Sequence, residues 1–254
     1  MSMAQAPLWN IDIMQSRPSR RAIIAGAAAA TLVPVVAKAA EPGRDDAAMV
    51  TDWPWLGRYA KDNARLHSEG MQIDIVFIGD SITELWKHRR PGFFSPKRIN
   101  RGIGGQTSPQ ILLRMMSDVI AHGPRIVHIL AGTNDVASNT GPIAEDTTVA
   151  NIVAMVQLAK ANGIRPVVGT IPPAAKFFWR PEVDPVGKIR AINRKLQMSS
   201  KSNRFTLVDY YGALASAEGA LPSTLGTDGV HPDASGYEWM EQALVDKVSA
   251  FRPV

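Results

Sequence analysis

Cysteine is absent from this chain of 254 residues. The absence excludes disulfide frameworks and thiolate metal sites, so the fold must rely on its hydrophobic core for stability. Hydrophobic residues make up 45% of the chain, charged residues 20% and aromatic residues 7%. This balance is typical of a soluble globular protein and is compatible with a single domain.

A strong excess of basic charge is also missing once the N-terminus is set apart. The chain has a net charge of +5, but residues 1–39 hold four basic residues and one acidic residue. The remainder therefore carries a net charge of only +2. Its densest basic cluster, Lys87-His88-Arg89-Arg90, is short and typical of a solvated loop. Without a basic stripe interleaved with aromatic residues, we expect no nucleic-acid partner.

The N-terminus lacks an apolar run long enough for a comfortable membrane span. Ser19-Arg20-Arg21-Ala22-Ile23-Ile24 resembles a twin-arginine export motif, an alanine-rich stretch occupies residues 25–36, and Ala37-Lys38-Ala39 supplies small residues for cleavage. We predict that residues 1–39 are a cleaved twin-arginine signal peptide. The mature chain would then have no membrane span and would reside in the periplasm or outside the cell. An uncleaved N-terminal arm is the alternative.

Short apolar segments alternate with amphipathic stretches in the rest of the chain, without internal repeats. We expect strands at residues 73–78, around residue 99, and at 126–130, 166–171 and 205–208. We expect helices at residues 53–67, 108–122, 147–161, 186–200 and 234–248. The alternation predicts an α/β fold in which a five-stranded parallel sheet is covered on both faces. Residues 40–70 would form a linker and a lead-in helix, and residues 71–254 the single domain.

Four polar motifs follow the expected strands or lie near the end of the chain. They are Gly79-Asp80-Ser81-Ile82, Gly104-Gly105, Gly132-Thr133-Asn134-Asp135 and Asp228-Gly229-Val230-His231. In an open parallel sheet, ligands bind outside the carboxyl ends of the strands, near the point where the strand order reverses. We therefore expect these four motifs to meet there.

Ser81, His231 and Asp228 have the residue types of a serine hydrolase triad. Ser81 would be the nucleophile at a strand-to-helix turn, His231 its general base, and Asp228 the carboxylate that holds the imidazole. The other four histidines lie within expected strands or helices or beside them, where packing or solvation is the expected role. Taken alone, the Asp228–His231 tetrapeptide is also compatible with an ordinary Asp-Gly turn.

The same motifs contain donors for an oxyanion hole. The Ser81 N–H, a glycine N–H from Gly104 or Gly105 and the Asn134 side-chain amide can converge on one point. Asn134 is alternatively a loop cap, because asparagine and aspartate readily bond nearby backbone, and we expect that capping role for Asp135.

Taken together, the four motifs resemble the blocks of GDSL-type esterases, also called SGNH hydrolases. Ile82 replaces the eponymous leucine of the first block, and the spacing of the second block favours Gly105 over Gly104 as the oxyanion donor. The resemblance spans about residues 70 to 250. It implies a flavodoxin-like three-layer α/β/α sandwich and a serine esterase that forms an acyl-enzyme and needs no metal or other cofactor.

Two alternatives come from other functional classes. Asp80, Asn134, Asp135 and His231 are also residue types that hold a divalent metal, as in a phosphoesterase, although the chain lacks the clustered ligands of such sites. A non-catalytic binding protein on the same fold is expected to have lost at least one motif, and none is missing. The G-x-S-x-G elbow of α/β-hydrolases is absent around Ser81.

The expected substrate is a small-molecule ester with a short acyl group, acetyl above all. No long apolar lid or amphipathic membrane helix is evident, which disfavours a long-chain lipase; a lysophospholipase-like or thioesterase-like activity is the alternative. Phe177, Phe178 and Trp179 follow the fourth strand and are candidate substrate-binding residues. Packing against the sheet edge is the other role for these three aromatics.

Overall fold

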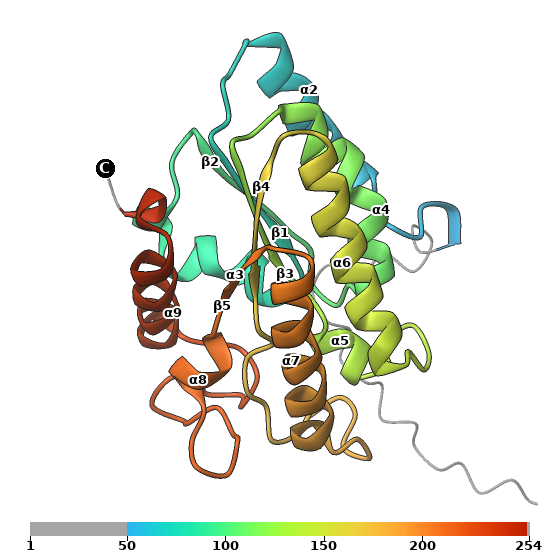
Figure 1. Ribbon diagram of the computed structural model, residues 1–254, viewed down its shortest axis with the longest axis vertical. Coiled ribbons are helices and arrows are strands. Elements are labelled where there is room, and N and C mark those ends of the chain that lie inside the picture. The colour runs from blue at the N-terminus through green and yellow to red at the C-terminus, as the bar shows by residue number, and fades with distance from the viewer. Residues whose placement is uncertain (1–49, 253–254) are drawn as a thin grey trace, which may run out of the picture. The chain divides into compact units, whose positions relative to one another are not determined.

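The computed structural model describes residues 50–252, so the predicted signal peptide lies outside the described residues. Within them a five-stranded, all-parallel sheet has the order β2-β1-β3-β4-β5. Its strands are β1 (Ile75–Gly79), β2 (Arg98–Gly102), β3 (Ile126–Leu130), β4 (Arg165–Gly169) and β5 (Thr206–Val208) (Figure 1). The predicted flavodoxin-like arrangement is confirmed.

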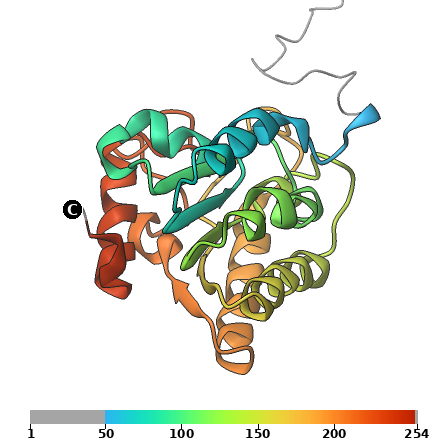
Figure 2. The same cartoon turned by 90° about the horizontal axis from the view of Figure 1, so that it is seen from above.

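Helices cover both faces of this sheet, as Figure 2 shows from above. One face packs against the buried sides of α2 (Gly57–Ser68), α4 (Ser108–Asp118), α6 (Glu145–Ala161) and α7 (Pro185–Ser202). The opposite face packs against α3 (Ser81–Arg89), α8 (Tyr210–Leu214) and α9 (Ala234–Lys247). Short 3-10 turns occupy Pro91–Phe93, Ile120–His122 and Ser249–Phe251. The result is the three-layer α/β/α sandwich that the resemblance implied.

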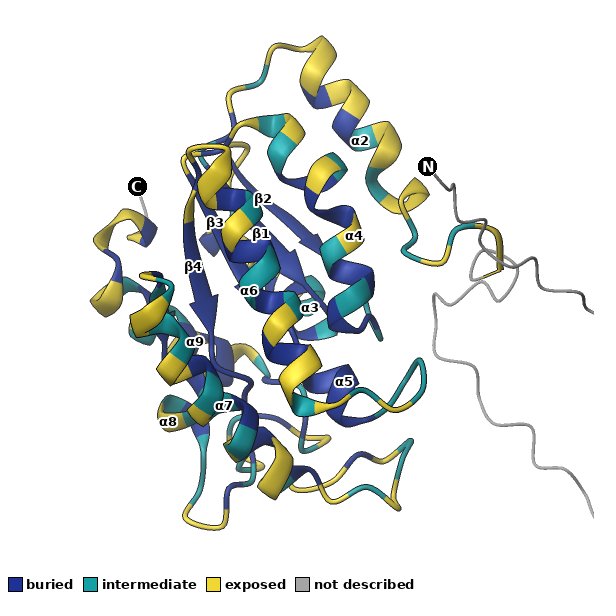
Figure 3. Cartoon of the chain, turned by 45° about the vertical axis from the view of Figure 1, so that its right-hand side comes forward, coloured by how far each residue is buried: buried dark blue, intermediate teal, exposed yellow. Residues whose placement is uncertain are grey.

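Side chains of β1 alternate between the two cores because a strand points successive residues to opposite faces. Val76 and Ile78 join the cluster under α4 and α6, whereas Ile75 and Phe77 join the cluster under α3 and α9. Every residue of β1 is buried, as expected for a central parallel strand. Figure 3 shows this pattern as buried strands beneath helices whose outer faces are exposed.

The strand register brings three loops to one edge of the sheet. Gly79, the last residue of β1, pairs with Gly102 at the end of β2 and with Leu130 at the end of β3. The loops that leave these three strands therefore start at one level, with β1 in the middle. No helix among the described residues is long and apolar enough to cross a membrane.

Candidate active site

Ser81 is the first residue of α3 and stands directly above the end of β1. Asp80 caps this helix, because its Oδ1 accepts a hydrogen bond of 3.0 Å from the Ile82 N–H. The Ser81 N–H belongs to the first turn, where backbone donors have no partner within the helix. The turn thus presents a hydroxyl and a backbone donor at the positive end of a helix dipole.

Asp80 itself is completely buried, and its second carboxylate oxygen, Oδ2, has no hydrogen-bond partner among the described residues. Burial raises the pKa of Asp80 to about 7, although the bond from the Ile82 N–H opposes the shift. The side chain therefore stabilises the turn as a cap, and its charge changes with pH near neutrality.

His231 and Asp228 complete a continuous line of hydrogen bonds to Ser81. The Ser81 Oγ lies 2.8 Å from His231 Nε2, and His231 Nδ1 lies 2.6 Å from Asp228 Oδ2. The other oxygen of Asp228 accepts bonds from the backbone N–H groups of Val230 (2.9 Å) and His231 (2.7 Å). Gly229 permits the tight turn that this requires, since its φ is +78°.

The charge state of Asp228 fixes the tautomer of the ring. Burial tends to raise the pKa of Asp228, but the bonds from the His231 ring and from two backbone N–H groups outweigh burial and lower it to about 2. An ionised carboxylate only accepts, so the proton of a neutral His231 resides on Nδ1. Its Nε2 is then an acceptor directed at the Ser81 hydroxyl.

The second motif lies beside Ser81, and its two glycines have different surroundings. The Gly104 N–H donates to Glu84 Oε2 at 2.8 Å, and a Cβ built on Gly104 would lie 3.8 Å from the Ser81 Cβ. Gly105 has a φ of +74°, a conformation that favours glycine. Glu84 therefore occupies the Gly104 N–H.

Asn134 lies on the short helix α5 (Thr133–Val136), which follows β3, and only 2% of it is exposed. Its Nδ2 donates to the Gln106 carbonyl at 3.0 Å, and its Oδ1 accepts from Asn139 Nδ2 at 2.8 Å. The side chain thus joins the loops after β2 and β3. An amide nitrogen carries two hydrogens, so the Gln106 bond occupies one of the two donors.

Asp135 has the capping role expected from the sequence, at the start of α4. Its carboxylate accepts hydrogen bonds from the Ser108 N–H (2.8 Å), from the Ser108 hydroxyl and from the Thr148 hydroxyl (3.1 Å). Burial raises the pKa of Asp135, and these bonds oppose the shift. Within residues 50–252, no group of three or more His, Cys, Asp or Glu side chains is arranged to hold a metal ion.

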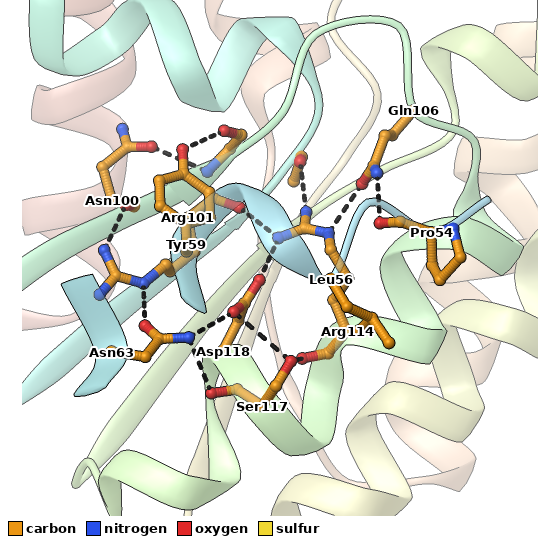
Figure 4. A network of polar contacts seen from close by, with 12 residues as sticks. Pro54, Leu56, Tyr59, Asn63, Asn100, Arg101, Gln106, Arg114, Ser117 and Asp118 are labelled. Atoms are coloured by element: carbon orange, nitrogen blue, oxygen red, sulfur yellow. Dashed lines mark hydrogen bonds and ion pairs between the residues drawn. The ribbon is translucent and has the colours of Figure 1, made fainter. Parts of the chain in front are cut away.

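The buried guanidinium of Arg114 takes part in a network of polar contacts (Figure 4). Arg114 donates to the carbonyls of Gly79 (3.2 Å) and Arg101 (2.9 Å), near the ends of β1 and β2. It also donates to Gln106 Oε1 at 2.8 Å and pairs with Asp118 at 2.6 Å. Neither partner of that ion pair is more than 1% exposed. Arg114 therefore ties two strand ends to the loop that carries Gly105.

The lead-in helix contributes to the same network. Gln106 Nε2 donates to the Pro54 carbonyl at 2.8 Å, and the Tyr59 hydroxyl donates to the Gly102 carbonyl. Arg58 reaches Glu84, the residue that binds Gly104, at 3.0 Å. Residues 54–59, which lie in the predicted linker and lead-in helix, thus stabilise the loop after β2.

The three aromatic candidates after β4 have different environments. Phe177 is completely buried in the aliphatic core, so the packing role holds for this residue and its predicted place in a substrate pocket is wrong. Phe178 is 56% exposed. Trp179 faces the site: its ring centre lies 6.5 Å from that of His231, with the planes 26° apart. Its indole nitrogen donates to Asn139 Oδ1 at 2.9 Å.

Of the other histidines, His128 and His122 make contacts unrelated to the Ser81 line. His128 is buried in β3, with Nε2 2.8 Å from the Tyr210 hydroxyl, and burial lowers its pKa to about 3. His122 bonds Asn63 at 2.9 Å.

Comparisons with known proteins identify the family of this chain. Residues 77–239 match the profile of the GDSL-like lipase/acylhydrolase family. A candidate acylhydrolase from Bacteroides fragilis is 43% identical, with a TM-score of 0.73, and the match covers 79% of this chain and 99% of that chain. A GDSL-like lipase from Bacteroides thetaiotaomicron is 41% identical, with a TM-score of 0.73, and the match covers 78% and 99%.

Two further relatives are more distant. An acetylxylan esterase from Geobacillus stearothermophilus shares the fold at 21% identity, with a TM-score of 0.56, over 70% of this chain and 96% of that one. An uncharacterised lipoprotein of Bacillus subtilis is 33% identical over 78 residues, which are 30% of this chain and 32% of the lipoprotein. With a profile match over most of its length and relatives above 40% identity, the chain belongs to the GDSL-like lipase/acylhydrolase family of ester hydrolases.

Proposed function

We propose that this chain is a serine esterase that cleaves carboxylic esters through an acyl-enzyme on Ser81. The observation that carries the proposal is the unbroken hydrogen-bond line from Asp228 through His231 to Ser81, with contacts of 2.6 and 2.8 Å. A nucleophile, its base and the group that orients the base are thus within bonding distance before substrate arrives.

In the first step His231 Nε2 takes the proton of the Ser81 hydroxyl as Oγ attacks the ester carbonyl. The tetrahedral intermediate collapses when His231 returns this proton to the leaving alcohol, which yields the acyl-enzyme. Water then attacks the acyl carbon while His231 Nε2 takes one of its protons, and the imidazolium passes this proton to Ser81 Oγ as the acid leaves. Asp228 holds the ring and stabilises the imidazolium, and its low pKa keeps it ionised throughout.

The negative charge on the substrate oxygen would be bound by three donors. The Ser81 N–H, the Gly105 N–H and the second hydrogen of the Asn134 amide come from the loops after β1, β2 and β3, whose strand ends are in register. Donors fixed in advance need no reorganisation during the reaction, and each contributes about 10²- to 10³-fold to the rate.

We further propose that the acyl group is short, with acetyl preferred. Trp179 supports this choice, because its ring stands 6.5 Å from that of His231 and a hydrogen bond to Asn139 holds it there. A fixed aromatic wall so close to the base leaves little length for an acyl chain. The exposed Phe178 beside it offers an apolar surface for the alcohol portion of the ester.

The proposed location is the periplasm or the exterior of the cell, after export through the twin-arginine signal in residues 1–39. The motif itself and the similarity of part of the chain to a lipoprotein support export. Fusion of residues 1–45 to a reporter tests this proposal: export that depends on Arg20 and Arg21 is expected, and retention in the cytoplasm would contradict it.

The activity is tested with p-nitrophenyl esters of increasing acyl length, followed by acetylated sugars. We expect kcat/KM to be highest for acetate and to fall with each added pair of carbons. A maximum at long acyl chains would instead support the lysophospholipase-like or thioesterase-like alternative. Activity against phosphate esters and not against carboxylic esters would overturn the proposal.

A further inference from the structure

We infer that Trp179 and Asn139 are positioning residues that set the orientation of the Asn134 amide in the oxyanion hole. The inference rests on the proposed function, because it assumes that Asn134 donates to the substrate oxygen. Neither residue belongs to the four motifs; Asn139 lies just after α5, and Trp179 lies in the loop after β4.

The hydrogen bonds from Trp179 through Asn139 to Asn134 are called the relay here. Its first hydrogen bond fixes the orientation of the Asn139 amide. An indole N–H can only donate, so the atom of Asn139 that lies 2.9 Å from Trp179 Nε1 must be the acceptor Oδ1. The amide nitrogen of Asn139 is then turned to the opposite side. There it donates to Asn134 Oδ1 at 2.8 Å and to the Gly105 carbonyl at 3.2 Å.

The second link fixes the amide of Asn134. Because Asn139 presents a donor, Asn134 must direct its oxygen towards Asn139 and its nitrogen the other way. That nitrogen donates one hydrogen to the Gln106 carbonyl at 3.0 Å, and its second hydrogen remains for the oxyanion. A half-turn of this amide would present an oxygen to the developing negative charge, so the donor would become a source of repulsion.

Backbone contacts around the relay restrict the positions of the Asn134 and Asn139 side chains. The Asn139 N–H bonds the Asn134 carbonyl at 3.1 Å, which closes the turn that carries both side chains. Ser138, between them, adopts a φ of +57°, which is uncommon for a residue other than glycine. Arg180 Nη2 donates to the Ser138 carbonyl at 2.9 Å and thereby fastens the Trp179 loop to this turn.

The relay therefore joins two parts of the site that the sequence separates. Trp179 beside His231 is connected through Asn139 to Asn134, the proposed oxyanion donor. The bond from Asn139 to the Gly105 carbonyl also connects the relay to the loop after β2. This arrangement lets the loop after β4 affect the rate of the chemical step and not only the fit of the acyl group.

The inference is tested with Trp179→Phe, which keeps an aromatic wall but removes the indole donor. We expect kcat for p-nitrophenyl acetate to fall about fivefold to tenfold, which corresponds to the net value of one hydrogen bond, with KM changed less than twofold. Asn139→Ala should lower kcat at least as much. Trp239→Phe is the matched control, since Trp239 is 58% exposed on α9 and is not part of the relay, and the kcat of this variant should stay at the wild-type value.

Combined variants separate positioning from a general structural effect. If Trp179 acts through Asn139 and Asn134, adding Trp179→Phe to Asn139→Ala or to Asn134→Ala should lower kcat by less than twofold further. Full multiplication of the separate effects in both backgrounds would overturn the relay. A Trp179→Phe variant with raised KM and unchanged kcat would also overturn it, because the residue would then only bind substrate.

These results are distinct from a failure of the proposed function. If Ser81→Ala and Asn134→Ala hydrolyse the ester at the wild-type rate, the proposed mechanism itself is wrong. If both variants are impaired and the effects of the single substitutions on kcat multiply in the combined variants, the mechanism stands and only the relay is rejected.

Discussion

The two halves of the site are held in place by different means. Ser81, Gly105 and Asn134 come from loops that leave three adjacent strands, above the buried Arg114–Asp118 pair. Asp228 and His231 come from the long connection between α8 and α9. The hydrogen bonds that Asp228 accepts all come from residues within three positions of it.

Because of this difference, substitutions in the two halves should affect stability and catalytic rate to different extents. The geometry of the nucleophile and oxyanion half depends on the sheet and on a buried polar network, so changes beneath it should affect stability as well as rate. The geometry of the acid–base half depends on one carboxylate in a local turn. Changes there should lower the rate and leave the fold nearly as stable as before.

The largest expected effect is on catalysis in the acid–base half. His231→Ala should lower kcat by roughly 10⁴-fold or more, because no other described group replaces the base beside Ser81. Its melting temperature should stay close to that of the wild type. Asp228→Asn should also lower kcat strongly, because a neutral amide no longer fixes the tautomer of the ring or stabilises the imidazolium. A His231→Ala enzyme that keeps more than about a tenth of wild-type kcat would contradict the assignment.

The next effect is on the oxyanion half. Asn134→Ala removes a donor used mainly in the transition state, so kcat should fall about 10²- to 10³-fold with little change in KM. Steady-state kinetics with p-nitrophenyl acetate measure both constants. If KM rises and kcat does not change, Asn134 binds ground-state substrate; if neither changes, Asn134 is only a loop cap.

The next prediction concerns the stability that the buried Arg114 gives to the half that contains Ser81. Arg114→Leu leaves Asp118 as an unpaired buried charge, so the free energy of unfolding should fall by about 3–5 kcal/mol, measured with urea. The control is Arg125→Ala, which breaks an exposed pair with Asp74 and should cost less than about 1 kcal/mol. Equal losses in the two variants would break the comparison between a buried support and a surface contact.

The carboxylates of the two halves should respond to pH with opposite signs. Folding raises the pKa of Asp80 from 3.8 to about 7, so its neutral form favours the folded state and stability is lost as pH rises through this window. Folding lowers the pKa of Asp228 to about 2, so its contribution is present above 3.8 and is lost as pH falls towards 2.

Asp80→Asn tests this sign, because asparagine keeps an acceptor for the cap but does not titrate in this range. Relative to wild type, the variant should gain stability as pH rises from 3.8 to about 7, by at most about 1.4 kcal/mol per unit. Urea unfolding at a series of pH values gives the difference between the two proteins. A difference that is constant across the window would show that Asp80 ionises normally.

The smallest expected effect is that of chelation. The proposed donors are a hydroxyl, backbone N–H groups and an amide, so dialysis against EDTA should leave kcat/KM unchanged. Loss of activity that Mn²⁺ or Zn²⁺ restores would favour the metal-dependent phosphoesterase alternative, with the site residues as ligands.

The main strands and helices could be predicted from the sequence because runs and periods of apolar residues are local features. The apolar runs at 73–78 and 126–130 became β1 and β3 with ends shifted by at most two residues. The helix expected at 53–67 begins instead at Gly57, since Asp52 caps the preceding turn through its carboxylate. The short helix α8 was not predicted, because five residues are too few to show a helical period.

The proposed site was predictable where each residue follows a strand or stands in a short motif. Its supports were not, because they depend on contacts between distant segments. Arg114 shows only as a polar residue in an amphipathic helix, and Asn139 only as a polar loop residue. Phe177 and Trp179 are two positions apart, yet one is in the core and the other faces His231. Sequence spacing alone could not separate them.

The central claim is that Ser81 is the group that becomes acylated. Its most direct test is labelling with a fluorophosphonate, followed by mass spectrometry of the digested protein. We expect one adduct per chain on the peptide that contains Ser81, no adduct in Ser81→Ala, and much slower labelling in His231→Ala. Labelling of another residue, or equal labelling of Ser81→Ala, would contradict the account.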